Sequence, residues 1–148
     1  LIFSKLFGGS RAKPAPPAAE EEDFDADALI EELKAAQGAI VNVTSIAGHL
    51  IHPFAGSAYS ISKAALSALT REMANEFADL GVRVNAVAPG EIETDMIQPE
   101  YELLIPRIPL GHMGAPEDVA KSVYYLCSDE SSYVTGSEIW VTGGQHMF

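Results

Sequence analysis

Apolar residues along the chain follow two different periods, and the change of period predicts where helices and strands lie. A repeat of three and four residues is typical of an amphipathic helix. We expect such helices over residues 23–37, 58–78 and 116–127. Short runs rich in β-branched residues are typical of buried strands. We expect such strands over residues 39–43, 82–87 and 139–141.

The two later helices carry apolar stripes that should face a core. In the longest helix the stripe consists of Ala65, Leu66, Leu69, Met73 and Phe77. In the last helix the residues expected to face inward are Val119, Val123, Tyr124 and Leu126. Cys127 lies on the same apolar helix, and we expect it to be a core residue rather than a reactive thiol, as unpaired cysteines usually are.

The elements alternate helix, strand, helix, strand, helix, strand. This order predicts an α/β fold with parallel strands and right-handed helical crossovers. Ligands in such sheets bind beyond the C-terminal ends of the strands, and polar and glycine-rich residues gather there, at 42–45, 87–94 and 142–144. Residues 91–114 form a long loop with a short helix near 101–105, and loops of this length are usually functional or mobile.

Composition narrows the possible partners. The 148 residues carry 9 basic and 21 acidic side chains, and the net charge of −12 argues against nucleic acid and against an anionic membrane surface. A single cysteine excludes a disulfide framework and a thiolate zinc site. No apolar stretch approaches the ~20 residues that span a bilayer. We therefore expect a cytoplasmic protein.

The first part of the chain differs from the rest in charge. Residues 1–19 carry three bases and no acid, whereas residues 20–32 carry eight acids and no base. Pro and Ala at 14–19 are typical of a semi-rigid linker. We expect a disordered tail over residues 1–22 and one α/β domain over residues 23–148. The initial Leu leaves open a processed chain, a fragment or an incomplete gene model.

Two side chains of the longest helix could carry acid–base chemistry. Tyr59 and Lys63 stand four residues apart and share one helix face, where a lysine cation favours the phenolate form of a tyrosine. Ser45 follows strand 39–43, and the loop from Ser45 to Tyr59 could bring both hydroxyls to one substrate oxygen. The residues alone leave two alternatives open: an accidental Tyr–Lys pair, and a strand cap made by Thr44 and Ser45.

Three histidines and a tryptophan have simpler interpretations. His49 and His52 lie in a loop without an acidic neighbour in sequence, so a loop or pocket wall explains them better than a metal site. We predict no metal ligand. His112 is expected to be structural, and Trp140 in the last strand is expected to pack against the core.

Several segments, in this order and at this spacing, resemble the short-chain dehydrogenase/reductase family. They are the strand and serine at 40–48, Tyr-x-x-x-Lys at 59–63, the segment 82–90 with Thr94 after it, and the segments 114–120, 134–136 and 141–144. The resemblance covers roughly residues 28–148. It implies the C-terminal half of a Rossmann-type domain, an incomplete parallel sheet of about three strands.

The resemblance implies a role for each matching residue. Tyr59 would be the catalytic acid/base, Ser45 would bind the substrate carbonyl or hydroxyl, and Lys63 would assist Tyr59 and hold the nicotinamide ribose. The other residues implied to contact the nicotinamide end of the cofactor are Pro89, Gly90, Ile92 and Thr94. Asn85 resembles a structural residue of the family. Loop 91–113 would be a mobile lid with a largely apolar wall over a small-molecule alcohol or carbonyl.

The N-terminal signatures of the family are absent from this sequence. It holds no Thr-Gly-x-x-x-Gly-x-Gly turn, whose glycines let backbone approach a pyrophosphate, and no Asn at the family's fourth catalytic position before Ser45. The resemblance implies an NAD(P)-dependent oxidoreductase, with NAD or NADP left open.

Three hypotheses remain for the chain as it stands. The first is an enzyme that obtains its cofactor half from a homo-oligomer or a complementing chain. The second is a non-catalytic interaction module that pairs through the open edge of strand 39–43, since an uncovered apolar edge is a template for pairing. The third is a truncated reading frame without a selected function. The family's usual dimer helix, 58–78, is present, and we expect the isolated chain to be marginally stable unless it oligomerises.

Overall fold

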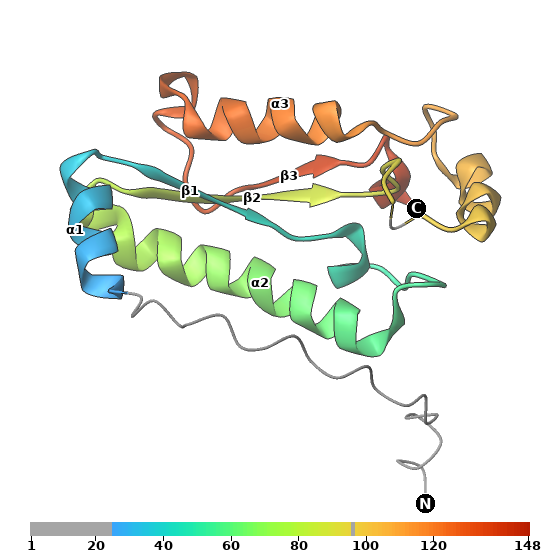
Figure 1. The fold of residues 1–148 in the computed structure, drawn as a ribbon, viewed down its shortest axis with the longest axis horizontal. Coiled ribbons are helices and arrows are strands. Elements are labelled where there is room, and N and C mark those ends of the chain that lie inside the picture. The colour runs from blue at the N-terminus through green and yellow to red at the C-terminus, as the bar shows by residue number, and fades with distance from the viewer. Residues whose placement is uncertain (1–24, 96) are drawn as a thin grey trace, which may run out of the picture.

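The computed structural model describes residues 25–95 and 97–148. The predicted tail at 1–22 lies outside the described residues. A sheet of three parallel strands lies between helices α2 and α3, which cover its opposite faces (Figure 1). The parallel sheet with helical crossovers confirms the predicted α/β class. No helix in the described part of the chain is long and apolar enough to cross a membrane.

The strands follow one another in the sheet in the order β1-β2-β3. They span Ala39–Val43, Arg83–Pro89 and Glu138–Val141. Val41 pairs with Asn85, and Val87 pairs with Ile139. Strand β2 is central and its interior residues are buried, which is the reason for its nearly continuous apolar sequence. Within the described residues, β1 and β3 each pair on one side.

The helices begin and end close to the predicted positions. They are α1 (Ala26–Ala35), α2 (Gly56–Phe77) and α3 (Pro116–Cys127). Asp25 caps α1 by accepting a hydrogen bond from the backbone N–H of Ala28. Short 3₁₀ segments occupy Ile46–Gly48, Ala78–Leu80, Pro99–Arg107, Asp129–Ser131 and Gln145–Met147. The helix expected near 101–105 is therefore a longer 3₁₀ segment.

The apolar core lies between the sheet and helices α1 and α2. Ala74, Val82 and Val84 are buried there. The partly buried side chains around them are Leu33, Ile40, Met73, Phe77 and Leu80. Asn85, fully buried in β2, is indeed structural, since its side chain donates to the carbonyl of Val134 at 2.8 Å and accepts from the N–H of Ser137 at 3.0 Å.

The apolar stripe predicted for α2 is wrong in part. Leu69 is 49% exposed and Ala65 is also exposed, whereas Ser67 and Thr70 are buried against the sheet. The sheet-facing side is polar in part because Thr70 accepts a hydrogen bond from the amide of Asn42 in β1, 2.9 Å away. Burying a polar side chain costs little free energy when it has a hydrogen-bond partner. A prediction from hydrophobicity alone therefore placed the sheet-facing side of α2 about one residue away from its position in the structure.

In α3, Tyr124 was predicted to face inward and does not. It is 77% exposed, whereas Leu126 is fully buried. Residues two positions apart stand about 200° apart around a helix, so Tyr124 and Leu126 cannot both face the sheet. Cys127, predicted to be a core residue, is exposed for the same reason, because it is rotated by about 100° from Leu126.

Candidate active site

A cavity of about 600 Å³ opens at the C-terminal ends of β1 and β2. This is the edge at which parallel sheets bind ligands. The cavity is lined by every residue that the sequence predicted for the site, namely Ser45, Tyr59, Lys63, Pro89, Gly90, Ile92 and Thr94. Segments far apart in sequence therefore converge on one space.

Ser45 stands where the chain leaves β1. Its side-chain oxygen accepts a hydrogen bond from the N–H of Ala47, 3.1 Å away, and so caps the 3₁₀ turn Ile46–Gly48. The same residue borders the cavity. The sequence left open whether Ser45 caps strand 39–43 or belongs to a catalytic site. In the structure Ser45 caps the 3₁₀ turn after that strand and also lines the cavity.

Gly48 lets this turn approach helix α2. A Cβ atom at Gly48 would lie 2.8 Å from the backbone nitrogen of Ala64 and 2.9 Å from the carbonyl carbon of Lys63. Real Cβ atoms do not approach backbone so closely, so only glycine fits here. The close approach brings the Ser45 turn against the helix that carries Tyr59.

Tyr59 and Lys63 lie in the first turns of α2 and face the cavity. The Lys63 ammonium lies 5.6 Å from the centre of the Tyr59 ring and donates to the carbonyl oxygen of Val43 at 2.8 Å. That bond ties the helix to the end of β1.

The turn after β2 forms the opposite wall. The N–H of Gly90 donates to the carbonyl of Val141 in β3 at 3.0 Å. A Cβ atom at Gly90 would lie 2.9 Å from the side-chain oxygen of Gln145. Ile92 then forms a parallel bridge with Gly114, which fixes the start of the long loop.

A histidine–glutamate pair at the cavity was not predicted. Nε2 of His52 lies 2.8 Å from Oε1 of Glu91, and both side chains are largely buried. Nδ1 of His52 accepts from the N–H groups of Phe54 and Ala55, so the proton is on Nε2 and is donated to Glu91. The Gln145 amide also donates to Glu91, at 3.2 Å. His52 is a pocket wall, as expected, but its acidic partner lies 39 residues further along the chain.

The Tyr101 ring of the long loop lines the cavity beside this pair and packs on rings from the loop before α2. The Tyr101 ring lies 4.9 Å from the Phe54 ring and 5.8 Å from that of His52, centre to centre. Burial, with the nearby negative charge of Glu91, raises the pKa of Tyr101 above its ordinary value, and Tyr59 and Glu100 act in the same direction. These causes all favour the protonated phenol of Tyr101 over the phenolate.

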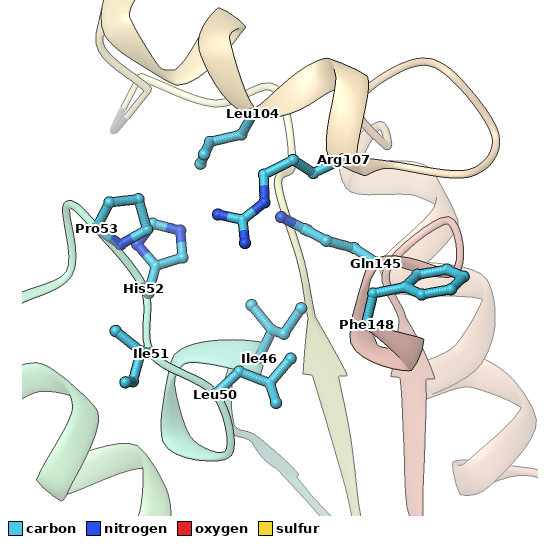
Figure 2. Close-up of a pocket in the computed structure, with 9 residues that line it drawn as sticks. All are labelled: Ile46, Leu50, Ile51, His52, Pro53, Leu104, Arg107, Gln145 and Phe148. Atoms are coloured by element: carbon cyan, nitrogen blue, oxygen red, sulfur yellow. The ribbon is translucent and has the colours of Figure 1, made fainter.

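A second, smaller cavity of about 60 Å³ adjoins the first and shares Ile46 and His52 with it. Figure 2 shows the Arg107 side chain reaching across it toward the amide of Gln145. Leu104 and Phe148 add apolar walls. The long loop therefore contributes to both cavities.

Comparison with known proteins identifies the family to which this chain belongs. Residues 26–146 match the family described as enoyl-(acyl carrier protein) reductase. Protein FixR of Bradyrhizobium diazoefficiens is 58% identical over 123 residues, which are 82% of this chain and 44% of FixR. The chain belongs to the short-chain dehydrogenase/reductase family.

Other members of this family match at similar coverage. The 3-oxoacyl-[acyl-carrier-protein] reductase FabG of Thermotoga maritima is 47% identical over 116 residues, which are 76% of this chain and 47% of that protein. A 3-oxoacyl-[acyl-carrier protein] reductase from Brucella melitensis, solved with bound NAD, superposes with a TM-score of 0.76 at 36% identity, covering 82% of this chain and 46% of that one. The chain thus spans about half the length of its relatives.

The cavity fits one end of a nicotinamide cofactor. Lys63 offers an ammonium donor and Tyr59 a hydroxyl, the groups that suit ribose hydroxyls. Main chain at Pro89–Ile92 provides a polar wall beside them. The glycine-rich turn that would hold the pyrophosphate is not in this sequence, so these residues would hold the nicotinamide and its ribose only.

Proposed function

We propose that this chain carries the substrate- and proton-handling half of an NAD(P)-dependent oxidoreductase that interconverts an alcohol and a carbonyl. The observation that carries the proposal is the single cavity lined by Ser45, Tyr59 and Lys63. These residues come from the end of β1 and from α2, and the Lys63–Val43 hydrogen bond keeps the two elements together.

Each residue has a distinct part in the proposed reaction. The Ser45 hydroxyl donates a hydrogen bond to the substrate oxygen and polarises the carbonyl. Tyr59 transfers its phenolic proton to the same oxygen as the alcohol forms, and it accepts that proton in the reverse direction. Lys63 stabilises the negative charge left on Tyr59, because its ammonium lies close to the phenol ring.

NAD or NADP is the cofactor that this site would take. A bound reduced nicotinamide supplies the hydride that adds to the carbonyl carbon. Lys63 and the turn Pro89–Gly90, with Ile92 and Thr94 beyond it, would hold the nicotinamide ribose and carboxamide against the cavity wall. The remaining cofactor contacts have to come from other residues, such as those of a complementing chain or an oligomer.

The walls of the cavity favour an apolar substrate around the reacting oxygen. Phe54, Ile97 and Val119 line the cavity together with the ring of Tyr101. Largely apolar walls with a few converging polar groups are typical of small-molecule sites. A small-molecule carbonyl or alcohol with an apolar body fits these surroundings.

An interaction module is the alternative function. It is favoured by one observation: within the described residues β1 pairs only with β2, so its outer edge offers hydrogen-bonding groups to another chain. Pairing through such an edge is a common mode of protein association. Under this alternative the cavity would be a remnant of an ancestral site.

Titration of the purified chain with NADH and NADPH, followed by nicotinamide fluorescence, tests the proposal. Saturable binding at micromolar concentrations and reduction of an apolar ketone would support it. If the chain binds neither cofactor, a separately expressed N-terminal half of the Thermotoga maritima reductase is added, and recovered activity would support the complemented enzyme. A folded chain that gains neither binding nor turnover overturns the enzymatic proposal and leaves the interaction module.

A further inference from the structure

A polar cluster centred on Glu138, which does not line the cavity, connects the last strand to the Ser45 turn. Glu138 in β3 stands 94 residues after Thr44, yet its Oε1 accepts hydrogen bonds from the hydroxyls of Thr44 and of Ser67, the latter at 2.9 Å. Its Oε2 lies 3.0 Å from Nε2 of His49. One carboxylate thus joins β1, α2 and the turn.

Two of these contacts flank Ser45. Thr44 directly precedes Ser45, and His49 is the C-cap of the 3₁₀ turn for which Ser45 is the N-cap. Both ends of the segment that presents Ser45 are therefore tied to Glu138. Since hydrogen bonds to a charged group are stronger than neutral ones, the carboxylate adds to the restraint that the turn receives from its own backbone bonds.

The same strand holds His49 from a second position. The ring of Trp140, two residues after Glu138, lies 4.6 Å from the ring of His49 in an edge-on arrangement. Residues two apart in a strand point to the same face. On its other side Trp140 stacks on His146, 4.8 Å away. The imidazole is thus fixed both by hydrogen bonding and by ring packing.

We propose that Glu138 is a positioning residue, which holds the Ser45 turn through Thr44 and His49 so that the Ser45 hydroxyl meets the same substrate oxygen as Tyr59. The inference rests on the proposed function, in which Ser45 polarises that oxygen. Glu138 does not line the cavity, so it acts through the turn and does not touch the substrate.

The cost of partly burying a carboxylate supports a specific role, since the Glu138 side chain keeps only 16% of its surface exposed. Removing a charge from water is expensive, and an apolar side chain of similar size would often serve stability as well or better. Here the carboxylate has Thr44, Ser67 and His49 as partners, and two of the three flank the proposed catalytic serine. A general need for stability does not explain that placement.

The test compares Glu138→Leu, which removes both ties, with Glu138→Gln, which keeps an acceptor for Thr44 and donates an amide N–H to His49 once the imidazole carries its proton on Nδ1 and accepts at Nε2. In the active chain, alone or complemented, Glu138→Leu should lower kcat for ketone reduction about 10- to 100-fold, since removing an oxyanion-type donor costs about 100- to 1,000-fold and a misplaced one somewhat less. Its NAD(P)H dissociation constant should change less than about twofold, because Glu138 lies outside the cofactor wall. Glu138→Gln should lower kcat less than Glu138→Leu does, because it keeps hydrogen bonds to Thr44 and His49 that are neutral and therefore weaker.

Thr70→Val is the matched control. It removes a buried hydrogen bond between α2 and β1 but touches neither Thr44 nor His49. It should lower the melting temperature and leave kcat unchanged. If Glu138→Leu lowers only the melting temperature, as Thr70→Val does, or if Glu138→Gln is as damaging as Glu138→Leu, the positioning role is wrong.

Amide hydrogen exchange at Ala47 separates this inference from the proposed function. The Ala47 N–H donates to the Ser45 side chain, so its protection reports the geometry of the turn without any turnover. Glu138→Leu, or Thr44→Val if that variant does not fold, should speed exchange at Ala47 at least tenfold while Val84 in β2 stays unchanged. A folded wild-type chain that has no activity either alone or with the added N-terminal half would overturn the proposed function, whereas unchanged Ala47 exchange would overturn the positioning role.

Discussion

The cavity edge of the sheet and the outer side of the molecule, where Tyr124 and Tyr133 lie, differ in how far their side chains are buried and hydrogen-bonded. At the cavity edge, the side chains of Glu91 and Thr44 are buried and hydrogen-bonded. On the outer side, the rings of Tyr124 and Tyr133 are 77% and 102% exposed.

The difference shows that contacts within the chain hold the cavity residues in place, whereas the sheet has an outer edge without a partner strand among the described residues. The proposed substrate-handling residues are positioned by contacts within this chain, because the Ser45 turn, α2 and β3 brace one another. The outer edge of β1 has no such support among the described residues. A chain that spans about half the length of its relatives can therefore keep the geometry of a site without the contacts for a whole cofactor.

The largest effect is expected from a substitution at the cavity. Tyr59→Phe removes the proposed proton donor and should lower ketone reduction about 100- to 10,000-fold, the range that general acid–base catalysis contributes. The fold should survive, since only a hydroxyl is lost. Steady-state NAD(P)H oxidation measures the effect. Tyr133→Phe, at a fully exposed tyrosine, is the control, and equal activity of the two variants would remove Tyr59 from the mechanism.

The two sides of α3 provide the next test. Leu126→Ala should lower the free energy of unfolding by about 2–5 kcal/mol, because it leaves a cavity at a fully buried position. Tyr124→Ala should change it by less than about 0.5 kcal/mol, because that ring is exposed. Urea unfolding of both variants measures the difference. A large cost at Tyr124 would show that a partner covers the outer side in solution.

A smaller effect is expected where the Ser45 turn meets α2. Gly48→Ala inserts a Cβ atom 2.8 Å from the Ala64 nitrogen, and relieving that overlap should cost about 1–3 kcal/mol. The turn should move away from Tyr59, so catalysis should fall together with stability. Gly48→Ala is compared with Ala47→Gly by thermal melting and by ketone reduction. If Gly48→Ala is destabilised but catalyses at the wild-type rate, the position of the turn does not affect catalysis.

The smallest effect concerns the cap at the start of α3. Asp118 accepts a hydrogen bond from the N–H of Ala115 at 3.0 Å, and this bond, with Lys121, lowers the pKa of Asp118 below its ordinary value. A carboxyl whose folded pKa is depressed stabilises the fold above its unfolded pKa, and that contribution is lost as the pH falls through the folded pKa. Melting temperatures of wild type and Asp118→Asn should therefore differ slightly at neutral pH and converge in acid. A constant difference down to acidic pH would contradict the cap.

The sequence was sufficient for the order of the elements and for the site residues that line the cavity. Strand 39–43 was predicted with the bounds that the structure has, because a β-branched run has few alternatives. Ser45, Tyr59 and Lys63 could be selected because family motifs fix them in local sequence. These features depend on neighbours within a few residues, which the sequence contains directly.

The partners of buried polar groups could not be found in this way. His49 and His52 have no acidic neighbour in sequence, yet Glu138 and Glu91 meet them in the structure. One signal was available for Glu91, which directly follows Pro89–Gly90 at the ligand-binding edge. No comparable signal existed for Glu138.

What the sequence by itself determined is therefore local: the element order, the parallel α/β class and the spacing of Tyr59 and Lys63 on one helix face. Only the tertiary structure decided which side of α2 and α3 faces the sheet, and that a carboxylate in β3 holds the turn at Ser45. The physical reason is that helical and strand periods act between close neighbours, whereas hydrogen bonds such as Thr44–Glu138 join residues 94 positions apart and exist only after the sheet has formed.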